Sequence, residues 1–218
     1  GVLEGIYNTV IVKDVLQRNK ILEHALLKRL VEFLAQNIGS INSVNSISNF
    51  LVSQKIIESS GKYPNRTIEN YILALQDAFI FYDIKRYDIR GKSLLKTLGK
   101  NYIVDIGLRN MLLGYRDTDR GHILENIIYI ELIRRGYKVY IGKYKDMEID
   151  FIAENPKEKI YYQITESLID KNTLEREISP LKQIDNNYEK VILSLDRNFI
   201  TSQDGIKIKY IIDFLLLN

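Results

Sequence analysis

The stretch KVYIGKYKDMEIDFIAENPKEKIYYQIT, residues 138–165, decides the fold. It contains three runs rich in β-branched and aromatic residues, a composition typical of strands, at 138–141, 148–153 and 160–165. Turn residues join the runs, among them Asn155-Pro156. We therefore expect three consecutive strands in one sheet.

Helical patterns flank these strands. A long helix is predicted from His122 to Arg135 and another from Leu174 to Ile184. Two more strand-like runs, 191–195 and 206–210, and a terminal helix complete the chain. This order predicts a mixed sheet with helices on its faces, in a domain that we expect over residues 106–218.

The N-terminal part has its own order of elements. Apolar residues at helical spacing predict a helical segment over residues 1–40. Two shorter helices follow, and then two β-rich runs, 79–84 and 101–104, with a basic loop between them. Two helices followed by a hairpin predict a winged helix-turn-helix over residues 41–105. The expected fold class is therefore α/β (α+β).

The amino-acid composition excludes several kinds of catalytic and binding site. Among 218 residues, 45% are hydrophobic, which excludes a disordered chain, and the net charge of only +3 requires any basic surface to be local. The chain has no cysteine, which excludes a disulfide scaffold and a cysteine nucleophile. Only His24 and His122 are available for a histidine site. The chemistry left open is that of carboxylates, or none.

The sequence also bears on location. No run approaches the roughly 18 to 20 apolar residues that a membrane span requires. The chain starts with Gly1 in an amphipathic pattern and has no export signal at its start. We therefore expect a fragment excised from a longer protein, located in the cytoplasm and without membrane contact.

A local basic surface is predicted in the wing. Between Lys85 and Lys100 there are six lysines and arginines and one acid, Asp88. A positive wing beside a recognition helix suits a phosphate backbone, so DNA is the expected partner. The candidate nucleic-acid-binding residues are Lys62, Asn65, Arg66, Asn70, Arg90 and Lys92. The alternatives for the same surface are a protein-interaction role and a solubility feature.

A second constellation follows the layout of a metal-dependent nuclease. In such enzymes an acid on one strand and a Glu-x-Lys on the next strand hold Mg²⁺, and the lysine orients or activates the attacking water. A carboxylate on a helix completes the cluster. The residues at these motif positions are Glu125, Asp150, Gln163 and Thr165. Period-two alternation places Glu148 and Asp150 on one face of their strand, so the candidate metal ligands are Asp150, Glu125 and Glu148.

Two of these identities do not suit cleavage. Gln163 stands where the second acid belongs and Thr165 where the lysine belongs, and neither an amide nor a hydroxyl supplies the missing charge. Glu166 is expected on the opposite face of the strand. We therefore expect a degenerate, inactive core. The alternative, an active Mg²⁺-dependent nuclease, would recruit Lys143 or Lys145.

Several short motifs follow one another along the chain. They are Glu4–Val10 with Lys13–Val15, Asn37–Ser40, Tyr87–Lys92, Gly121–Asn126 with Arg135–Tyr137, and Glu148–Phe151. In this order they resemble the C-terminal region of a prokaryotic AAA+ ATPase family. In that family an N-terminal P-loop ATPase module precedes a domain of unknown function, which resembles a winged helix joined to a restriction-endonuclease-like fold.

The resemblance implies a role for the whole chain. It implies the C-terminal two-domain part of an AAA+ ATPase, which recognises DNA or a protein partner and is energised by the missing ATPase module. Since this sequence has no phosphate-cradling Gly-x-x-x-x-Gly-Lys-Ser/Thr loop, ATP is expected only in that module. Glu125 and Asp150 match the family's nuclease motif, with Glu148 as an additional candidate. A purely protein-interaction or assembly module remains the third possibility.

Overall fold

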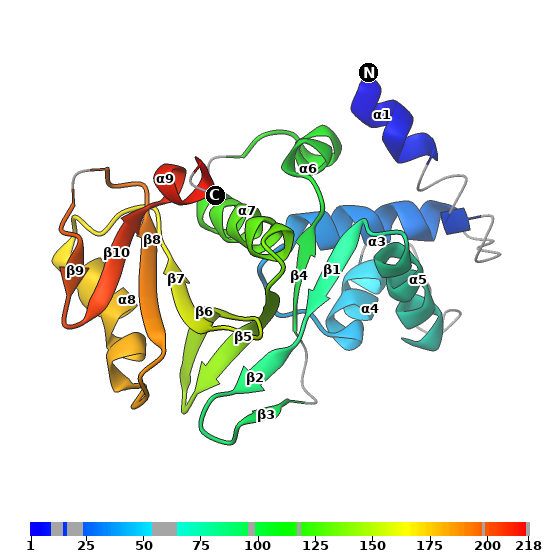
Figure 1. Ribbon diagram of the computed structural model, residues 1–218. Helices are drawn as coiled ribbons and strands as arrows, with labels where there is room; N and C mark the ends of the chain where they lie inside the picture. The colour runs from blue at the N-terminus through cyan, green and yellow to red at the C-terminus, as the bar shows by residue number, and fades with distance from the viewer. Residues whose placement is uncertain are drawn as a thin grey trace. The chain divides into compact units, whose positions relative to one another are not determined.

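The chain forms two compact units (Figure 1). In this computed structural model the described residues are 1–9, 15–16, 24–53, 65–95, 99–116, 119–197 and 199–216. Unit 1 consists of Gly1–Asp83 with Leu98–Asp117, and unit 2 of Ile84–Thr97 with Thr118–Asn218. Helices and a mixed sheet together confirm the predicted α/β (α+β) class.

Unit 1 is mainly helical. Its elements are α1 (Val2–Tyr7), α3 (His24–Gln36), α4 (Val44–Ser53), α5 (Asn65–Asp77), β1 (Phe81–Ile84), β4 (Lys100–Ile103) and α6 (Ile106–Leu113). Strands β1 and β4 form a two-stranded sheet. The core is apolar, with Leu30, Leu51 and Leu75 fully buried. The buried guanidinium of Arg109 enters this core and donates from Nε to the Ala35 carbonyl oxygen at 2.9 Å.

Unit 2 is built on an eight-stranded sheet in the order β3-β2-β5-β6-β7-β8-β10-β9. Its strands are β2 (Arg86–Asp88), β3 (Ser93–Leu94), β5 (Lys138–Tyr144), β6 (Met147–Glu154), β7 (Lys159–Ile164), β8 (Glu189–Ser194), β9 (Ser202–Gln203) and β10 (Ile206–Tyr210). Strands β5, β6 and β7 form an antiparallel meander, whereas β8 is parallel to both β7 and β10. The mixture of directions follows from the helix that separates β7 from β8, because a parallel neighbour needs a long crossover.

Helices cover both faces of this sheet. Helix α7 (Arg120–Arg134) packs against β5, β6 and β7, and α8 (Lys171–Gln183) packs against β6, β8 and β10. Phe151 contacts Tyr129 of α7, while its neighbour Ile152 joins the core cluster that contains Ile178 of α8. Consecutive strand residues point to opposite faces, so α7 and α8 lie on opposite sides of the sheet. The terminal helix is α9 (Ile211–Leu216).

One irregularity in the sheet matters for the site. Tyr140 pairs with Ile152 and Gly142 with Ile149, so the register between β5 and β6 shifts by one residue. An extra residue in one strand breaks the alternation of side chains. Ile149 and Ile152 accordingly belong to the same core cluster, although three positions separate them. The strict alternation expected through Glu148 and Asp150 therefore does not extend along the whole of β6.

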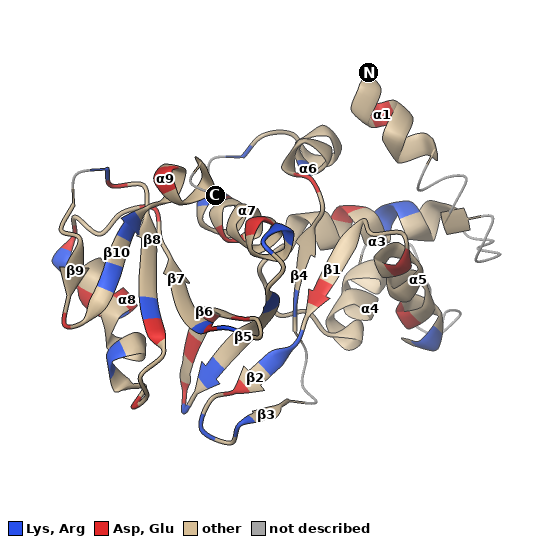
Figure 2. Cartoon of the chain, in the orientation of Figure 1, with Lys and Arg blue, Asp and Glu red and all other residues tan. Residues whose placement is uncertain are grey.

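The expected wing is divided between the units. Strands β1 and β4 pair in unit 1, but the residues between them form the β2–β3 hairpin, and β2 pairs in parallel with β5 of unit 2. Figure 2 shows Lys and Arg on the turn of this hairpin. The winged helix-turn-helix over residues 41–105 stays a prediction. No helix in the described ranges is long and apolar enough to cross a membrane.

Candidate functional site

A cleft of about 480 Å³ in unit 2 is lined by three of the four nuclease-motif positions, all except Gln163. We call it the motif cleft. Its lining includes Glu125 of α7, Asp150 of β6, Thr165 and Glu166 after β7, and Arg176 and Glu177 of α8. Glu166 lies just beyond the end of β7 at Ile164 and lines the same cleft as Thr165, and the face expected for its side chain stays a prediction. The structure thus brings together residues that lie far apart in the sequence.

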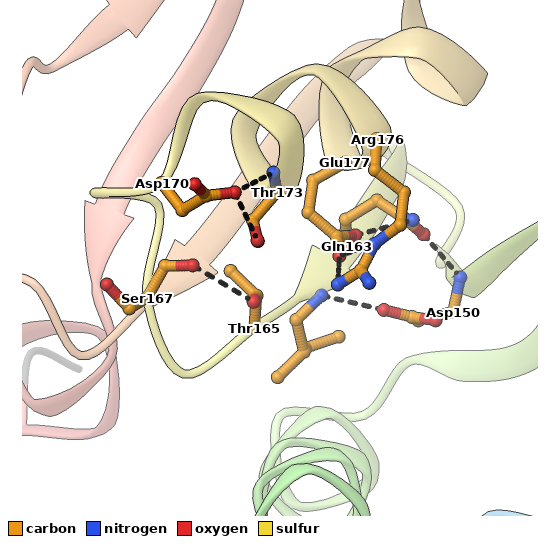
Figure 3. A network of polar contacts seen from close by, with 9 residues as sticks. Asp150, Gln163, Thr165, Ser167, Asp170, Thr173, Arg176 and Glu177 are labelled. Carbon is orange, nitrogen blue, oxygen red and sulfur yellow. Dashed lines mark hydrogen bonds and ion pairs between the residues drawn. The ribbon is translucent and has the colours of Figure 1, made fainter.

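At the motif cleft, β6 and β7 separate and side chains bridge the gap (Figure 3). The last pair of the ladder is Phe151 with Tyr162. Beyond it, the Asp150 backbone N–H donates to Gln163 Oε1 at 2.8 Å, and the Ile164 backbone N–H donates to Asp150 Oδ2 at 2.7 Å. Backbone groups inside a protein need such partners. Two motif residues therefore replace missing bonds of the sheet.

A carboxylate from α8 extends this network. Gln163 Nε2 donates to Glu177 Oε2 at 3.1 Å, and Glu177 Oε1 accepts from Arg176 Nη2 at 2.8 Å. The Glu177 side chain is only 9% exposed. A buried carboxylate has to be paired or hydrogen-bonded, and both kinds of partner are present. Each functional atom of the Gln163 amide thus has a partner inside the protein.

The sequence interpretation missed Arg176 and Glu177. A signal was available, because Leu174, Ile178 and Leu181 form an apolar stripe at helical spacing and Glu177 lies on that stripe. An acid on the buried face of a helix requires a partner in the core. In the structure, Gln163 of β7 is one such partner.

The positions of the acids can be compared with the predicted Mg²⁺ site. Four carboxylates line the motif cleft, but no three His, Cys, Asp or Glu side chains in the described part of the chain are grouped so that they could hold a metal ion. Glu166 lies 3.4 Å from Arg120, and Glu125 lies 3.8 Å from His122. An acid that is paired with an arginine or used in hydrogen bonds inside the protein is less available to Mg²⁺, which binds oxygen ligands. As placed, the described residues form no such group, and a Mg²⁺ site at the motif cleft stays a prediction.

Several other residues that the nuclease hypothesis names lie outside the lining of the motif cleft. Glu148 is outside the lining of the motif cleft, and its carboxylate lies 3.9 Å from Arg86 of β2. Lys143 and Lys145, the lysines considered as replacements, are also outside that lining. Thr165 Oγ1 makes a long 3.4 Å contact to the Ser167 carbonyl oxygen. The structure thus joins Asp150, Glu125, Gln163 and Thr165 in one region and leaves Glu148 apart from them.

The predicted nucleic-acid-binding residues fall into two groups. Asn65, Arg66 and Asn70 are exposed on α5 of unit 1, where Asn65 Nδ2 donates to Asn45 Oδ1 at 2.7 Å. Arg90 and Lys92 are exposed on the β2–β3 turn of unit 2. Lys62 lies outside the described residues.

Arg90 and Lys92 line a larger cleft of unit 2, with a volume of about 870 Å³. We call it the tyrosine cleft, because four tyrosines line it. They are Tyr87, Tyr144, Tyr161 and Tyr188. The charged residues of the lining are Arg90, Lys92, Lys159 and Asp185, so cations outnumber acids by three to one. A basic surface with aromatic rings between its charges is typical of nucleic-acid binding.

The turn that carries the two exposed cations is held in shape. The backbone N–H groups of Arg90 and Gly91 both donate to Asp88 Oδ1 at 3.0 Å, and the Leu95 N–H donates to the Arg86 carbonyl oxygen at 2.9 Å. Such a side-chain-to-backbone turn fixes the local conformation. The one acid of the hairpin is therefore used within the turn.

Lys159 is fixed inside the tyrosine cleft. Its Nζ lies 2.7 Å from Glu154 Oε2, 5.2 Å from the centroid of the Tyr87 ring and 5.6 Å from that of Tyr188. Burial alone would lower the pKa of Lys159, but the hydrogen bond and charge of Glu154 outweigh burial and raise that pKa. Lys159 is therefore charged at neutral pH and contacts two aromatic rings.

Comparison with known proteins gives the family. Residues 2–119 match the family described as "Domain of unknown function (DUF8612)". The chain belongs to this family. The match covers more than half of the chain and includes the β2–β3 hairpin, so both groups of predicted nucleic-acid-binding residues lie within it.

Two relatives of this DUF8612 member are longer proteins. An "Uncharacterized protein" of Haemophilus influenzae is 40% identical over 215 residues, which are 99% of this chain and 52% of the relative. An uncharacterized protein of Methanocaldococcus jannaschii is 28% identical over 223 residues, which are 97% of this chain and 47% of the relative. The chain thus spans about half the length of the curated relatives it matches. No solved structure matches it.

Proposed function

We propose that this chain is a nucleic-acid recognition module, in which unit 2 supplies a binding surface and does not cleave its ligand. The observation that carries the proposal is the tyrosine cleft, where exposed Arg90 and Lys92 lie on a fixed turn beside aromatic rings. Lysine and arginine bind nucleic acids chiefly by neutralising phosphates. The chain's net charge of +3 is small, and this local excess of cations explains how it would still attract a polyanion.

The winged-helix interpretation adds a second surface to the proposal. Helices α4 and α5 pack against each other in unit 1, and α5 exposes Asn65, Arg66 and Asn70. These side chains can donate hydrogen bonds to phosphates or base edges. In the proposal α5 is the recognition helix.

The proposal also covers the larger protein. The chain spans about half of its relatives, which leaves room in them for another module. The resemblance in sequence makes that module an AAA+ ATPase, which binds ATP and energises the work of the chain. The meander β5–β6–β7, followed by α8 and the parallel strand β8, is compatible with a restriction-endonuclease-like unit.

The polar network at the motif cleft supports binding without cleavage. In the proposal Asp150 and Gln163 are structural residues, because their side chains complete the hydrogen bonding of the separated strands β6 and β7. A carboxylate that accepts a backbone N–H and an amide bonded on both of its atoms are poorly placed to hold an ion or activate water.

Salt-dependent binding tests the proposal. The full chain is titrated onto labelled duplex and single-stranded DNA between about 50 and 200 mM salt, the range over which phosphate contacts lose affinity most clearly. We expect affinity to fall with salt, and the Arg90→Ala/Lys92→Ala variant to reduce the slope of log affinity against log salt by about 1 to 2.

A matched control separates a specific surface from general charge. Lys138→Ala/Lys171→Ala removes the same charge from exposed positions of unit 2 outside the tyrosine cleft. This control should leave the slope close to that of the unmodified chain. Absence of binding at low salt would refute the proposal and turn the search to a protein partner. Equal slopes for both double variants would refute the role of Arg90 and Lys92.

One observation favours the second candidate, a Mg²⁺-dependent nuclease. Glu125 and Asp150 line the same cleft, as two metal-binding acids would. Plasmid nicking with Mg²⁺ or Mn²⁺ tests this candidate. We expect no nicking above the level of Asp150→Ala. Nicking that is lost in Asp150→Ala would establish the nuclease in place of the proposal.

A further inference from the structure

We propose that the tyrosine cleft binds one unstacked base of a single-stranded nucleic acid, with Tyr188 as the stacking surface and with Arg90 and Lys92 on the flanking phosphates. This inference rests on the proposed function and names the form of nucleic acid that the cleft accepts. It makes single strands, not duplexes, the preferred ligands of unit 2.

Tyr188 is the most accessible ring of the cleft. It exposes 49% of its surface, whereas Tyr161 exposes 3%. Tyr188 lies just before β8, and its backbone N–H donates to Asn186 Oδ1 at 3.2 Å. The Asn186 Nδ2 in turn donates to the hydroxyl of buried Tyr161 at 3.0 Å. The loop that carries Tyr188 is therefore tied to the sheet, so the ring needs little ordering before it binds.

Contacts behind the ring orient it. The Tyr161 and Tyr188 ring centroids are 6.1 Å apart at an interplanar angle of 67°, an edge-to-face arrangement. Lys159 Nζ lies 5.6 Å from the Tyr188 centroid and is paired with Glu154. These neighbours hold the ring in place. The half that remains exposed can accept a base, because every base has a π face and stacking is tolerant of sequence.

The cations that line the tyrosine cleft have different roles. Lys159 is already paired with Glu154 and contacts two rings, so it supports the aromatic wall. Neither Arg90 nor Lys92 forms an ion pair with any residue that the structure describes, and both are exposed on the fixed turn. They are the groups of this cleft that can bind phosphates on either side of a base.

The form of the cleft favours a single strand. Its volume of about 870 Å³ lies within the range of about 300–1,000 Å³ typical of pockets for small ligands, which is enough for a nucleotide. In a duplex the faces of the bases are covered by their neighbours, and only their edges are accessible in the grooves. A tyrosine face can therefore reach only a base that has left the stack. Strands of DNA and RNA share this chemistry.

The experiment compares ring variants on matched strands. Anisotropy titrations use the full chain with labelled oligo(dT) and oligo(U) of about 12 nucleotides, a length within the usual site sizes, and with a duplex of equal length. We expect single strands to bind more tightly than the duplex. Tyr188→Ala should weaken binding to single strands by about tenfold, while Tyr188→Phe should stay within about twofold of the unmodified chain. The salt slope should stay the same in both variants, because stacking releases no counterions.

Two controls keep the result interpretable. Tyr115→Ala removes a tyrosine that is 69% exposed in unit 1, outside the cleft, and should leave affinity unchanged. A 2-aminopurine placed within oligo(dT) reports stacking on the unmodified chain without any substitution, and its fluorescence should be quenched on binding. Comparing oligo(dT) with oligo(U) shows which of these two strands the cleft prefers, although they differ in both the sugar and the 5-methyl group of the base, and preference for either strand over the duplex supports the inference.

The outcomes separate this inference from the proposed function. Salt-dependent binding to single strands with equal affinities for Tyr188→Ala and the unmodified chain would overturn the inference and leave the recognition module standing. Failure of every nucleic acid to bind would overturn both. Loss of affinity in Tyr188→Ala together with quenching of 2-aminopurine would support both.

Discussion

The linings of the two clefts of unit 2 contain similar numbers of charged residues, but these residues differ in whether they are available to a ligand. At the motif cleft, Asp150, Gln163 and Glu177 form hydrogen bonds with partners inside the protein. In the tyrosine cleft, Arg90 and Lys92 are exposed and the only acid of their hairpin is used within the turn. A buried polar group that is fully bonded stabilises a fold, whereas an exposed one remains available to a ligand.

This difference teaches that similarity to a nuclease motif and availability for chemistry are separate properties. The residues that carry the motif are the less available ones. Three substitutions can break or sharpen the comparison, and we take them from the largest expected effect to the smallest.

Gly142→Ala should have the largest effect. A Cβ at this position would lie 2.7 Å from Ile149 Cβ and 3.2 Å from Ile152 Cγ1, at the register shift that includes Asp150 on the neighbouring strand β6. Because these atoms belong to buried core residues, overpacking should lower the free energy of unfolding by about 3 kcal/mol, measured by urea denaturation. Gly121→Ala, with no atom within 4 Å and a helical position, should be neutral or stabilising. Equal stability of the two variants would contradict the tight packing at Gly142.

Gln163→Ala tests the structural role of the motif cleft. It removes the acceptor of the Asp150 N–H and the donor to Glu177, so we expect a loss of about 2 kcal/mol in the free energy of unfolding. Gln183→Ala, an exposed glutamine on α8, should change it by less than about 0.5 kcal/mol. Nucleic-acid binding by the folded Gln163→Ala protein should match that of the unmodified chain. A stable Gln163→Ala variant with altered binding would reverse the assignment of the two clefts.

Glu131→Gln tests cations that, unlike Arg90 and Lys92, are already paired with an acid. Hydrogen bonds from Arg134 lower the pKa of Glu131, burial opposes them, and Arg135 lowers the pKa further. A lowered pKa in the folded state gives stability that is present above the unfolded-state pKa of about 4.3 and is lost as pH falls through the folded-state pKa. The free energy of unfolding of the variant should therefore be lower by about 1 kcal/mol than that of the unmodified chain at pH 7. This difference in the free energy of unfolding should shrink below about pH 4. A difference that does not depend on pH would exclude this ion pair as its cause.

Much of the fold could be predicted from the sequence. Short-range patterns determine helices and strands, so the strands near 138–165 and the helices before and after them lie where periodicity placed them. The pairing of β2 with β5 could not be predicted, because partners so far apart in sequence leave no local signal. Nor does a single sequence reveal the register shift at Gly142, which depends on packing across two strands.

The candidate site shows the same division. Glu125, Asp150, Gln163 and Thr165 could be selected because motif spacing is a local property, and the structure brings them together. The tyrosine cleft could not be selected, since its rings come from β2, β5, β7 and the loop before β8. Arg90 and Lys92 were chosen for charge alone. The tyrosines come to lie beside them only through the pairing of strands in the folded sheet.

The outermost strands of the unit 2 sheet have a consequence for solubility. Among the described residues, β3 and β9 are the two edges, and each has only two residues. A long unpaired edge offers backbone groups to another chain and promotes aggregation, whereas a very short edge strand offers few. Ile206 and Lys207 of β10 pair with β9, so deletion of residues 202–203 would uncover the edge of a longer, five-residue strand. The two-residue edges thus protect the sheet from polymerising edge to edge.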